Sequence, residues 1–277
     1  MGIKQFFKLF NGNEVQLSDL SGSTIAIDAM TEIYRAALGT PNVNTLNAPD
    51  GSPTAHINII LLMASKMKRL NIKQIFVFDS EIPPPAKIKE LKRRQECKSK
   101  TTDKKRSFSV TSEMIKEVKF VIHNLGIDYI NTPDGYDAEH ICALLNKRGT
   151  VDHILTTDAD TFIYGGISIL KWEKRKLIQY TRDELIKATN LNEEQLLRLG
   201  VCMGTDFCDK TPRVGLKTVV KKCVDIDLTN EQKNAILIFK GSPKIPSIIL
   251  GEMDKTILSC FLELKGFNRK RIEQILQ

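Results

Sequence analysis

The sequence has little glycine, little proline, few aromatic side chains and no long hydrophobic run. Its 277 residues include 16 glycines, 10 prolines and 6% aromatic residues, which excludes collagen-like and low-complexity chains. The longest apolar stretch, around residues 57–64, is far too short to cross a membrane. The N-terminus lacks the apolar segment of a secretory signal. We therefore expect a soluble, intracellular protein that has no membrane partner.

Cysteine is present, but not in a metal-binding arrangement. The six cysteines lie at irregular intervals and none forms a C-x-x-C pair, which argues against a zinc site. A chain of this length buries enough apolar surface to fold without covalent staples. We therefore expect free thiols, as in other intracellular proteins.

Positive charge is concentrated in one segment. The formal net charge is +8, and residues 87–106 hold ten Lys or Arg against three Asp or Glu, a net of +7. Acids are too scarce in this segment to neutralise it through pairs along a helix. A charged helix is usually a solvated face, but this excess favours phosphate binding. The cations that we expect on a helix after the prolines at 83–85 are Lys87, Lys89, Lys92, Arg93 and Arg94.

Short apolar runs in the first 160 residues each end on an aspartate. The pairs are residues 24–27 with Asp28, residues 75–78 with Asp79, and residues 154–157 with Asp158. Continuous apolar runs separated by helical stretches are typical of buried parallel strands. We therefore expect an α/β fold with a mainly parallel twisted sheet flanked by helices. In such sheets the functional site lies beyond the carboxyl ends of the strands.

Helices are expected between and after these strands. The Ser-Pro pair at residues 52–53 predicts the start of a helix that runs to about residue 70. Further helices are expected over 113–125 and 137–147. From about residue 183 the chain becomes helical with little strand signal, and the expected helices cover 183–189, 193–203, 215–225, 230–240, 254–265 and 268–276.

Seven carboxylates fall at expected ends of elements: Asp28, Asp79, Asp137, Glu139, Asp158, Asp160 and Asp206. Gathered in one cleft they would repel one another, and Mg²⁺, which prefers oxygen ligands, would relieve that repulsion. Two such ions about 4 Å apart suit phosphodiester cleavage. Each aspartate alone is more readily explained as a cap or turn residue. The joint pattern at several strand ends favours the metal site.

A second basic stretch begins the helical half. Gly215, within residues 211–218, predicts a tight turn before a helix whose first amides could hold a phosphate. Lys217 and Lys221 add positive charge there. Such turns are common, so this pattern alone is a weak indication of DNA binding.

Taken in order, these pieces resemble the flap endonuclease family, the structure-selective 5′ nucleases related to xeroderma pigmentosum group G. The resemblance covers essentially the whole chain. The segments that carry it are the opening MGIKQFFKLF, IAIDA at 25–29, FVFD at 76–79, Asp-Ala-Glu at 137–139, TDAD at 157–160 and GTDFC at 204–208.

The resemblance implies roles residue by residue. One divalent metal would be served mainly by Asp28, Asp79, Asp137 and Glu139, and the other mainly by Asp158, Asp160 and Asp206. Two Mg²⁺ ions are implied, with Mn²⁺ as a substitute. Lys87 and Arg94 would contact the scissile phosphate from a gateway helix. Gly2 would lie near the active site, and Tyr34 would stack on a base. Residues 211–225 resemble a helix–two-turn–helix that holds duplex DNA, usually with K⁺.

The sequence departs from the family pattern at several places. Asp137 stands where the family has a glutamate, so one ligand is shorter by a methylene. Arg213 stands where the family has a glycine in the turn that holds K⁺. The arch is short, with sixteen residues between Arg94 and Thr111. No motif typical of sliding-clamp binding follows the core, so we expect no such tail.

We therefore predict one 5′ nuclease domain over residues 1–277. Its parts are an N-terminal nuclease region (1–85), a gateway helix and arch (86–112), an internal nuclease region (113–200), and the helix–two-turn–helix with C-terminal helices (201–277). The predicted enzyme is a structure-specific, metal-dependent 5′ endonuclease. It would cut branched or flapped DNA near single-strand/double-strand junctions and leave a 5′-phosphate and a 3′-hydroxyl.

Other activities stay open from the sequence. The short arch favours a Holliday-junction-resolvase-like enzyme as the alternative, and a 5′ exonuclease belongs to the same family. A non-catalytic protein that binds branched DNA is the alternative of another class. We expect a monomer, or a dimer on four-way junctions. It would act in replication, repair or recombination, in the nucleus or at another site of DNA replication, such as the viral factory for a viral member.

Overall fold

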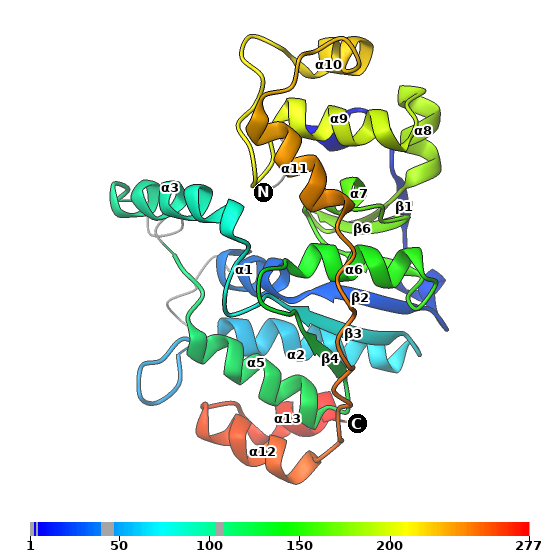
Figure 1. The fold of residues 1–277 in the computed structure, drawn as a ribbon. Coiled ribbons are helices and arrows are strands. Elements are labelled where there is room, and N and C mark those ends of the chain that lie inside the picture. Colours follow the sequence, from blue (N-terminus) through cyan, green and yellow to red (C-terminus); the bar gives the residue numbers. More distant parts are fainter. Residues whose placement is uncertain (1–2, 4, 40–46, 103–107, 277) are drawn as a thin grey trace.

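A mixed sheet of seven strands lies at the centre of the computed structural model, which describes residues 3, 5–39, 47–102 and 108–276 (Figure 1). The strand order is β1-β7-β6-β5-β2-β3-β4. The strands from β2 to β6 pair in parallel, and β7 and β1 complete one edge in antiparallel pairing. The bounds of the strands are β1 Asn13–Val15, β2 Thr24–Asp28, β3 Lys73–Phe78, β4 Asp128–Asn131, β5 His153–Leu155, β6 Ser168–Glu173 and β7 Lys176–Thr181.

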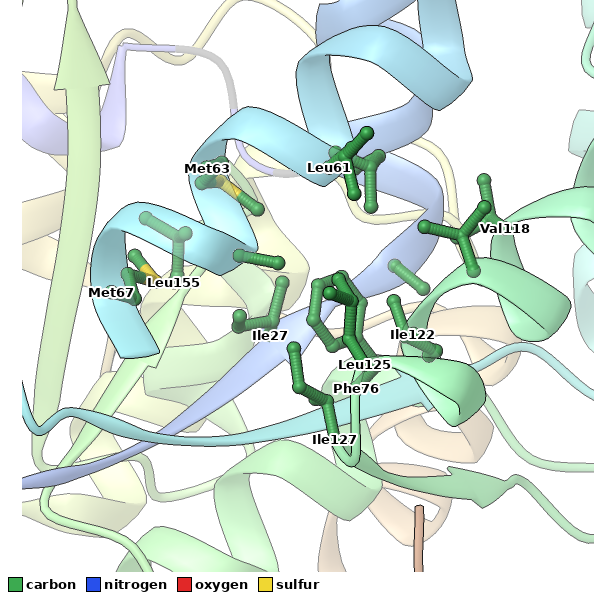
Figure 2. Packing of buried hydrophobic residues seen from close by; sticks show 14 of the residues in the cluster. Ile27, Leu61, Met63, Met67, Phe76, Val118, Ile122, Leu125, Ile127 and Leu155 are labelled. Atoms are coloured by element: carbon green, nitrogen blue, oxygen red, sulfur yellow. The ribbon is translucent and has the colours of Figure 1, made fainter. Parts of the chain in front are cut away.

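The central strands are apolar throughout because helices cover both faces of the sheet. In β2, Ile25 and Ile27 face one side and pack with α1 (Ala29–Gly39) and α2 (Ala55–Arg69). Ala26, between them, faces α6 (Ala138–Lys147) on the other side. Figure 2 shows the first face, where side chains of β2 and β3 meet those of α2 and α5 (Ser112–Asn124).

The remaining helices form two groups at opposite ends of the molecule (Figure 1). The group α8 (Arg182–Thr189), α9 (Glu193–Met203), α10 (Leu216–Lys222) and α11 (Asn230–Lys240) shares a core with the short α7 (Asp160–Ile163) and the 3₁₀ helix η1 (Phe6–Lys8). Helices α12 (Lys255–Leu264) and α13 (Arg269–Leu276) pack beside α5 and α2. The basic segment forms the 3₁₀ turn η4 (Pro85–Lys87) and α3 (Ile88–Ser99), which projects from the body. A further 3₁₀ helix, η2, spans Leu17–Leu20.

The predicted fold class is confirmed, and several boundaries are corrected. The helix predicted from the Ser-Pro pair begins at Ala55 instead, and Pro53 forms a bridge with Asn47. Helix α10 ends at Lys222, three residues before the predicted end. The strand before Asp158 ends at Leu155, two residues early. No helix in the described ranges is both long and apolar enough to span a membrane.

Candidate active site

The predicted carboxylates meet at the carboxyl edge of the parallel strands. Asp28 ends β2, Asp79 follows β3, and Asp158 follows β5. Because these strands are parallel neighbours, their ends reach the same edge of the sheet. Helix α6 adds Asp137 at its N-cap and Glu139 in its first turn. Five of the seven predicted ligands are thus placed by the sheet and one helix start.

Hydrogen bonds fix the orientation of the carboxylates at the strand ends. Asp28 is 2% exposed and accepts hydrogen bonds from Thr31 N at 3.1 Å and Thr156 Oγ1 at 2.9 Å. Asp79 accepts from Ala138 N at 2.9 Å, which ties the end of β3 to the start of α6. These contacts hold the acids in place before any cation binds.

The last two predicted acids come from the α7 and α9 region. Asp160 begins α7 and accepts a hydrogen bond from Ile3 N at 3.1 Å, while its own amide donates to Asp158 Oδ1 at 3.0 Å. Asp206 follows α9 in a turn that begins at Gly204, whose φ is 83°. A Cβ at Gly204 would lie 2.9 Å from Lys210 N, so this tight turn requires glycine.

Burial and mutual repulsion raise the pKa values of several of these acids. The pKa of Asp28 is raised by burial and then by Asp79. Burial, followed by repulsion from Asp158 and Asp206, holds the pKa of Asp160 well above its usual range. The pKa of Glu139 is also held well above its usual range, first by burial and then by Asp28 and Asp79, although Lys87 opposes the shift. The seven carboxylates therefore form one electrostatically linked cluster.

The donor set fits a hard divalent cation. Carboxylate oxygens of Asp79, Asp137 and Glu139 lie within 4.8 Å of one another. Glu139 Oε2 is buried and has no hydrogen-bond partner among the described residues, an arrangement that costs free energy unless a cation or water satisfies the atom. Oxygen-only ligands at this density suit Mg²⁺ or Mn²⁺.

Lys87 lies inside this cluster. Its side chain is 10% exposed, and Nζ lies 2.9 Å from Asp137 Oδ1 and 3.4 Å from Asp206 Oδ2. Burial alone would lower the pKa of Lys87, but the surrounding carboxylates, led by Glu139 and Asp137, outweigh it and raise the pKa. The ammonium group is therefore a fixed cation at the carboxylate cluster.

Arg94 reaches the same cluster from the second turn of α3. Its Nη2 donates to Asp206, and its Nε donates to Glu90 Oε1 at 2.8 Å. Lys87 and Arg94, the two cations predicted to act on the phosphate, thus meet at Asp206. The structure brings the predicted basic and acidic residues into one site.

Other cations of the basic segment are paired more than the sequence suggests. Arg93 donates to Glu90 Oε2 at 2.6 Å, and Lys89 contacts Asp209 at 2.7 Å and Glu231 at 3.1 Å. The expectation that pairs along this helix would not neutralise it is therefore wrong in part, because Glu90 pairs with both Arg93 and Arg94 on α3. The two partners of Lys89 come from the distant α9–α11 region. Lys92 is exposed on α3.

Tyr34 lies beside the last turn of α3. It is half-buried on α1, with the Phe108 ring edge-on at 6.0 Å between centroids. Lys98 lies 5.4 Å above the Tyr34 ring and donates to its hydroxyl at 3.3 Å. Gly2, the other residue expected here, lies outside the described residues.

The turn before α10 differs from the prediction. Gly215 has φ −94° and ψ 164°, an extended conformation that any residue adopts. The left-handed residue is Arg213, with φ 58°, which costs roughly 1 kcal/mol or more for a side chain other than glycine. Lys217 and Lys221 are exposed on α10, so they are available to phosphates.

Two residues near the site escaped the sequence reasoning. Glu90 accepts hydrogen bonds from both Arg93 and Arg94. The two arginines follow Glu90 by three and four residues on an expected helix, a spacing that predicts such pairs. Phe108 stands beside Tyr34, and no spacing rule connects residues so far apart in the chain.

Comparison with protein families gives matches at both ends of the nuclease region. The model of the XPG N-terminal domain matches residues 1–101, and that of the XPG I-region matches residues 126–206. Flap endonuclease 1 of Theileria annulata is 28% identical over 96% of this chain and 60% of its own length. Flap endonuclease 1 of Encephalitozoon cuniculi is 27% identical over 99% of this chain and 93% of its own length. The chain spans about three fifths of the first relatives it matches.

Solved structures share the fold. Flap endonuclease-1 from Methanococcus jannaschii superposes with a TM-score of 0.79 at 20% identity and covers 99% of this chain and 96% of its own. The catalytic core of Rad2 in complex with DNA substrate superposes with a TM-score of 0.74 at 22% identity and covers 99% of this chain and 98% of its own. Human GEN1 in complex with Holliday junction DNA superposes with a TM-score of 0.76 at 20% identity and covers 99% of this chain and 77% of its own. These identities establish a likeness of fold.

Proposed function

The chain belongs to the flap endonuclease/XPG family, and on that premise we propose that it is a structure-specific, metal-dependent 5′ endonuclease. It would cut one phosphodiester bond near a single-strand/double-strand junction, such as a 5′ flap, and leave a 5′-phosphate and a 3′-hydroxyl. The observation that carries this proposal is the cluster of seven carboxylates, six of them buried or half-buried and Asp79 exposed, beside Lys87 and Arg94. A protein that only binds phosphates would gain nothing from the carboxylates.

The acidic residues of the chain would bind the metal ions. Asp28, Asp79, Asp137 and Glu139 would hold one divalent ion, and Asp158, Asp160 and Asp206 the other. The chemistry that two such ions supply when bound is activation of a water and neutralisation of the leaving oxygen.

The cations of η4 and α3 would act on the phosphate itself. The Lys87 ammonium lies inside the carboxylate cluster and the Arg94 guanidinium contacts it at Asp206, where they can offset the negative charge that builds on the phosphate. Tyr34 would stack on the neighbouring base, and Gly2 is the further contact that we propose near the site. Lys92 and Arg93, exposed on α3, would attract the single strand, while Lys89 would join them only by leaving its acidic partners.

The duplex would bind at the turn between α9 and α10. Lys217 and Lys221 offer positive charge to its backbone, and the extended Gly215 leaves the backbone open, since a Cβ there would meet nothing within 4 Å. We include K⁺ in the proposal as a ligand of this turn, although the cation of Arg213 would weaken it. Comparing duplex affinity in K⁺ and in Na⁺ tests this part: equal affinities exclude a role for K⁺.

Activity on four-way junctions is the second candidate. Helix α3 ends at Ser99 and α5 begins at Ser112, so the arch is short and offers less cover to a threaded strand. Such an enzyme would dimerise on a junction and make paired nicks, whereas a flap needs one monomer. In either case we propose that the protein works where DNA is replicated or repaired, in the nucleus or a viral factory.

One panel of end-labelled substrates tests the proposal. The wild type and Asp158→Ala are incubated with Mg²⁺ and 5′-flap, nicked, bubble and four-way DNA. We expect cleavage of the flap by the wild type and none by the variant. Equal cleavage by both would exclude the metal role, and preferred symmetric nicking of the four-way substrate would favour the second candidate. Absence of cleavage on every substrate, with retained binding, would indicate a non-catalytic protein.

A further inference from the structure

A cavity opens beside the carboxylate cluster, next to η4 at the base of the arch. Its volume is about 500 Å³, within the range of pockets that bind small organic groups, about 300–1,000 Å³. Its walls come from η4 with the proline before it, the loop that leads into α6, and the end of α11. Asp137 lines the cavity and also belongs to the proposed metal ligands. A group seated in the cavity would therefore be next to the site of cleavage.

One wall is an aromatic ladder. Tyr136 lies edge-on to His140 at 5.8 Å, His140 stacks on Tyr164 at 4.2 Å with 18° between planes, and Tyr164 packs on Phe239 at 4.6 Å. The His140 ring is held by a hydrogen bond from its Nε2 to Gly241 O at 3.0 Å. Tyr136, His140 and Tyr164 all line the cavity, so the ladder presents a rigid, pre-formed surface to it.

Apolar side chains also line the cavity, and one of them is open to solvent. Leu237 on α11 lines the cavity and is 68% exposed, and Pro84 and Pro85 line it from another chain segment. An exposed large apolar side chain is ordinary when isolated. Here it lines the same cavity as three aromatic rings, which together make a slot suited to a flat apolar group.

The charge of the residues that line the cavity indicates which kind of chemical group can bind there. The described residues that line the cavity include Asp134 and Asp137 but no lysine or arginine. A phosphate would be repelled there. The pairing edge of each nucleobase carries at least one N–H group that can donate a hydrogen bond to a carboxylate, and its faces can stack on aromatic rings.

We infer that this cavity binds one unpaired nucleobase of the strand held at the carboxylates. The inference deepens the proposed function and rests on it. The sugar-phosphate would stay at the carboxylates and the cations of η4 and α3, while the base turns into the slot between Tyr136 and Leu237. The cavity thereby anchors the cleaved strand by a contact that tolerates any base, in addition to the contact at Tyr34.

A fluorescence experiment that needs no cleavage tests the cavity. 2-Aminopurine is placed at each nucleotide near the junction of a 5′-flap substrate, one per oligonucleotide, and binding is followed with Ca²⁺ in place of Mg²⁺. We expect one position at which binding changes the emission and at which Tyr136→Ser and Leu237→Ser each abolish the change. Both variants should also weaken binding of intact DNA by about tenfold, the usual scale for the loss of one stacking contact.

The matched control is Leu264→Ser, since Leu264 is 77% exposed on α12 and does not line the cavity. It should behave as the wild type. Leu237→Ser alters an exposed side chain and so should fold even if Tyr136→Ser does not.

The inference is wrong if the change in emission persists at every position in both cavity variants. It is also wrong if Leu264→Ser abolishes the change as the cavity variants do. Failure of the proposed function would look different: the wild type would cut none of the branched substrates with Mg²⁺, while the position-specific fluorescence would still report the cavity.

Discussion

The side-chain nitrogen of Lys87 lies 2.9 Å from Asp137 Oδ1, among the carboxylates that fit a divalent cation. A cation of the chain thus neutralises part of the cluster from within. A metal ion entering the cluster would meet this positive charge at close range, so Lys87 and the metal compete for the same oxygens. A phosphate bound at the site would give Lys87 another partner.

We expect Lys87→Met to bind Mg²⁺ more tightly in the absence of DNA. Removing one like charge at this distance is worth about 1 kcal/mol or more at intermediate dielectric, or roughly fivefold in affinity. Isothermal titration of the DNA-free protein measures the change. Lys89→Met is the matched control, because Lys89 is 67% exposed and pairs with Asp209 and Glu231 instead. An unchanged affinity in Lys87→Met would mean that the ammonium does not compete with the ion.

We expect Asp160→Asn to stabilise the metal-free protein. The substitution removes one charge from a buried, mutually repelling cluster and keeps an oxygen for the hydrogen bond from Ile3 N. Thermal unfolding in EDTA should occur a few degrees higher than in the wild type, as for a gain of about 1 kcal/mol. Added Mg²⁺ should raise the melting temperature of the wild type more than that of the variant. A lower melting temperature of the variant in EDTA would contradict the repulsion argument.

We expect Arg94→Ala to slow cleavage far more than it weakens binding. Because the guanidinium contacts Asp206 at the cluster, its charge acts where the transition state gains charge, and such losses reach about a hundredfold in kcat. Arg93→Ala is the matched control, since Arg93 pairs with the same Glu90 but is 64% exposed. Single-turnover rates and filter binding separate the two effects. Equal losses of rate and affinity would show that Arg94 only binds phosphate.

We expect the Lys217→Ala, Lys221→Ala double variant to bind duplex DNA with a weaker salt dependence. Each lost phosphate contact should lower the slope of log K against log salt concentration by about 0.9. Titrations at four salt concentrations, with wild type and variant in parallel, give both slopes. If the slope stays unchanged, α10 does not contact the backbone.

The pair of His56 and Glu117 predicts how stability depends on pH. His56 Nε2 lies 2.7 Å from Glu117 Oε2 in the core between α2 and α5. Burial lowers the pKa of His56 below its usual value of 6.5, against the opposing effect of Glu117 and with a small contribution from Lys265. The unfolded chain therefore takes up this proton first as the pH falls.

The stability that comes from neutral His56 should be complete above pH 6.5 and decline below it, by up to about 1.4 kcal/mol per pH unit. Urea unfolding of wild type and His56→Gln at pH 7.5 and pH 5.5 measures this. The wild type should lose more stability between the two values than the variant, because the glutamine does not titrate. Equal losses would exclude His56 as the cause.

Much of the central sheet could be predicted because burial leaves a strong pattern. The strands that lead to Asp28 and Asp79 are buried on both faces, and the predicted helix before β4 has a clear N-cap in Thr111. The hairpin of β6 and β7 escaped prediction because both strands are only partly buried, with Glu173 half-buried and Lys176 exposed, and its pairing is set by contact with neighbouring strands. The turn at Arg213 escaped because its backbone follows from packing that local propensity does not describe.

The sequence by itself determined the chemistry of the site: which residues are acidic, that they follow buried strands, and that one segment is basic. These follow from residue type and local periodicity. Only the tertiary structure decided which oxygens meet, that Lys87 and Arg94 pair with Asp137 and Asp206, and that a cavity lined by Tyr136 and Leu237 opens beside them. Those relationships depend on how the parallel strands, α6, α3 and α11 pack. Packing is a property of contacts between distant residues, and no local pattern encodes it.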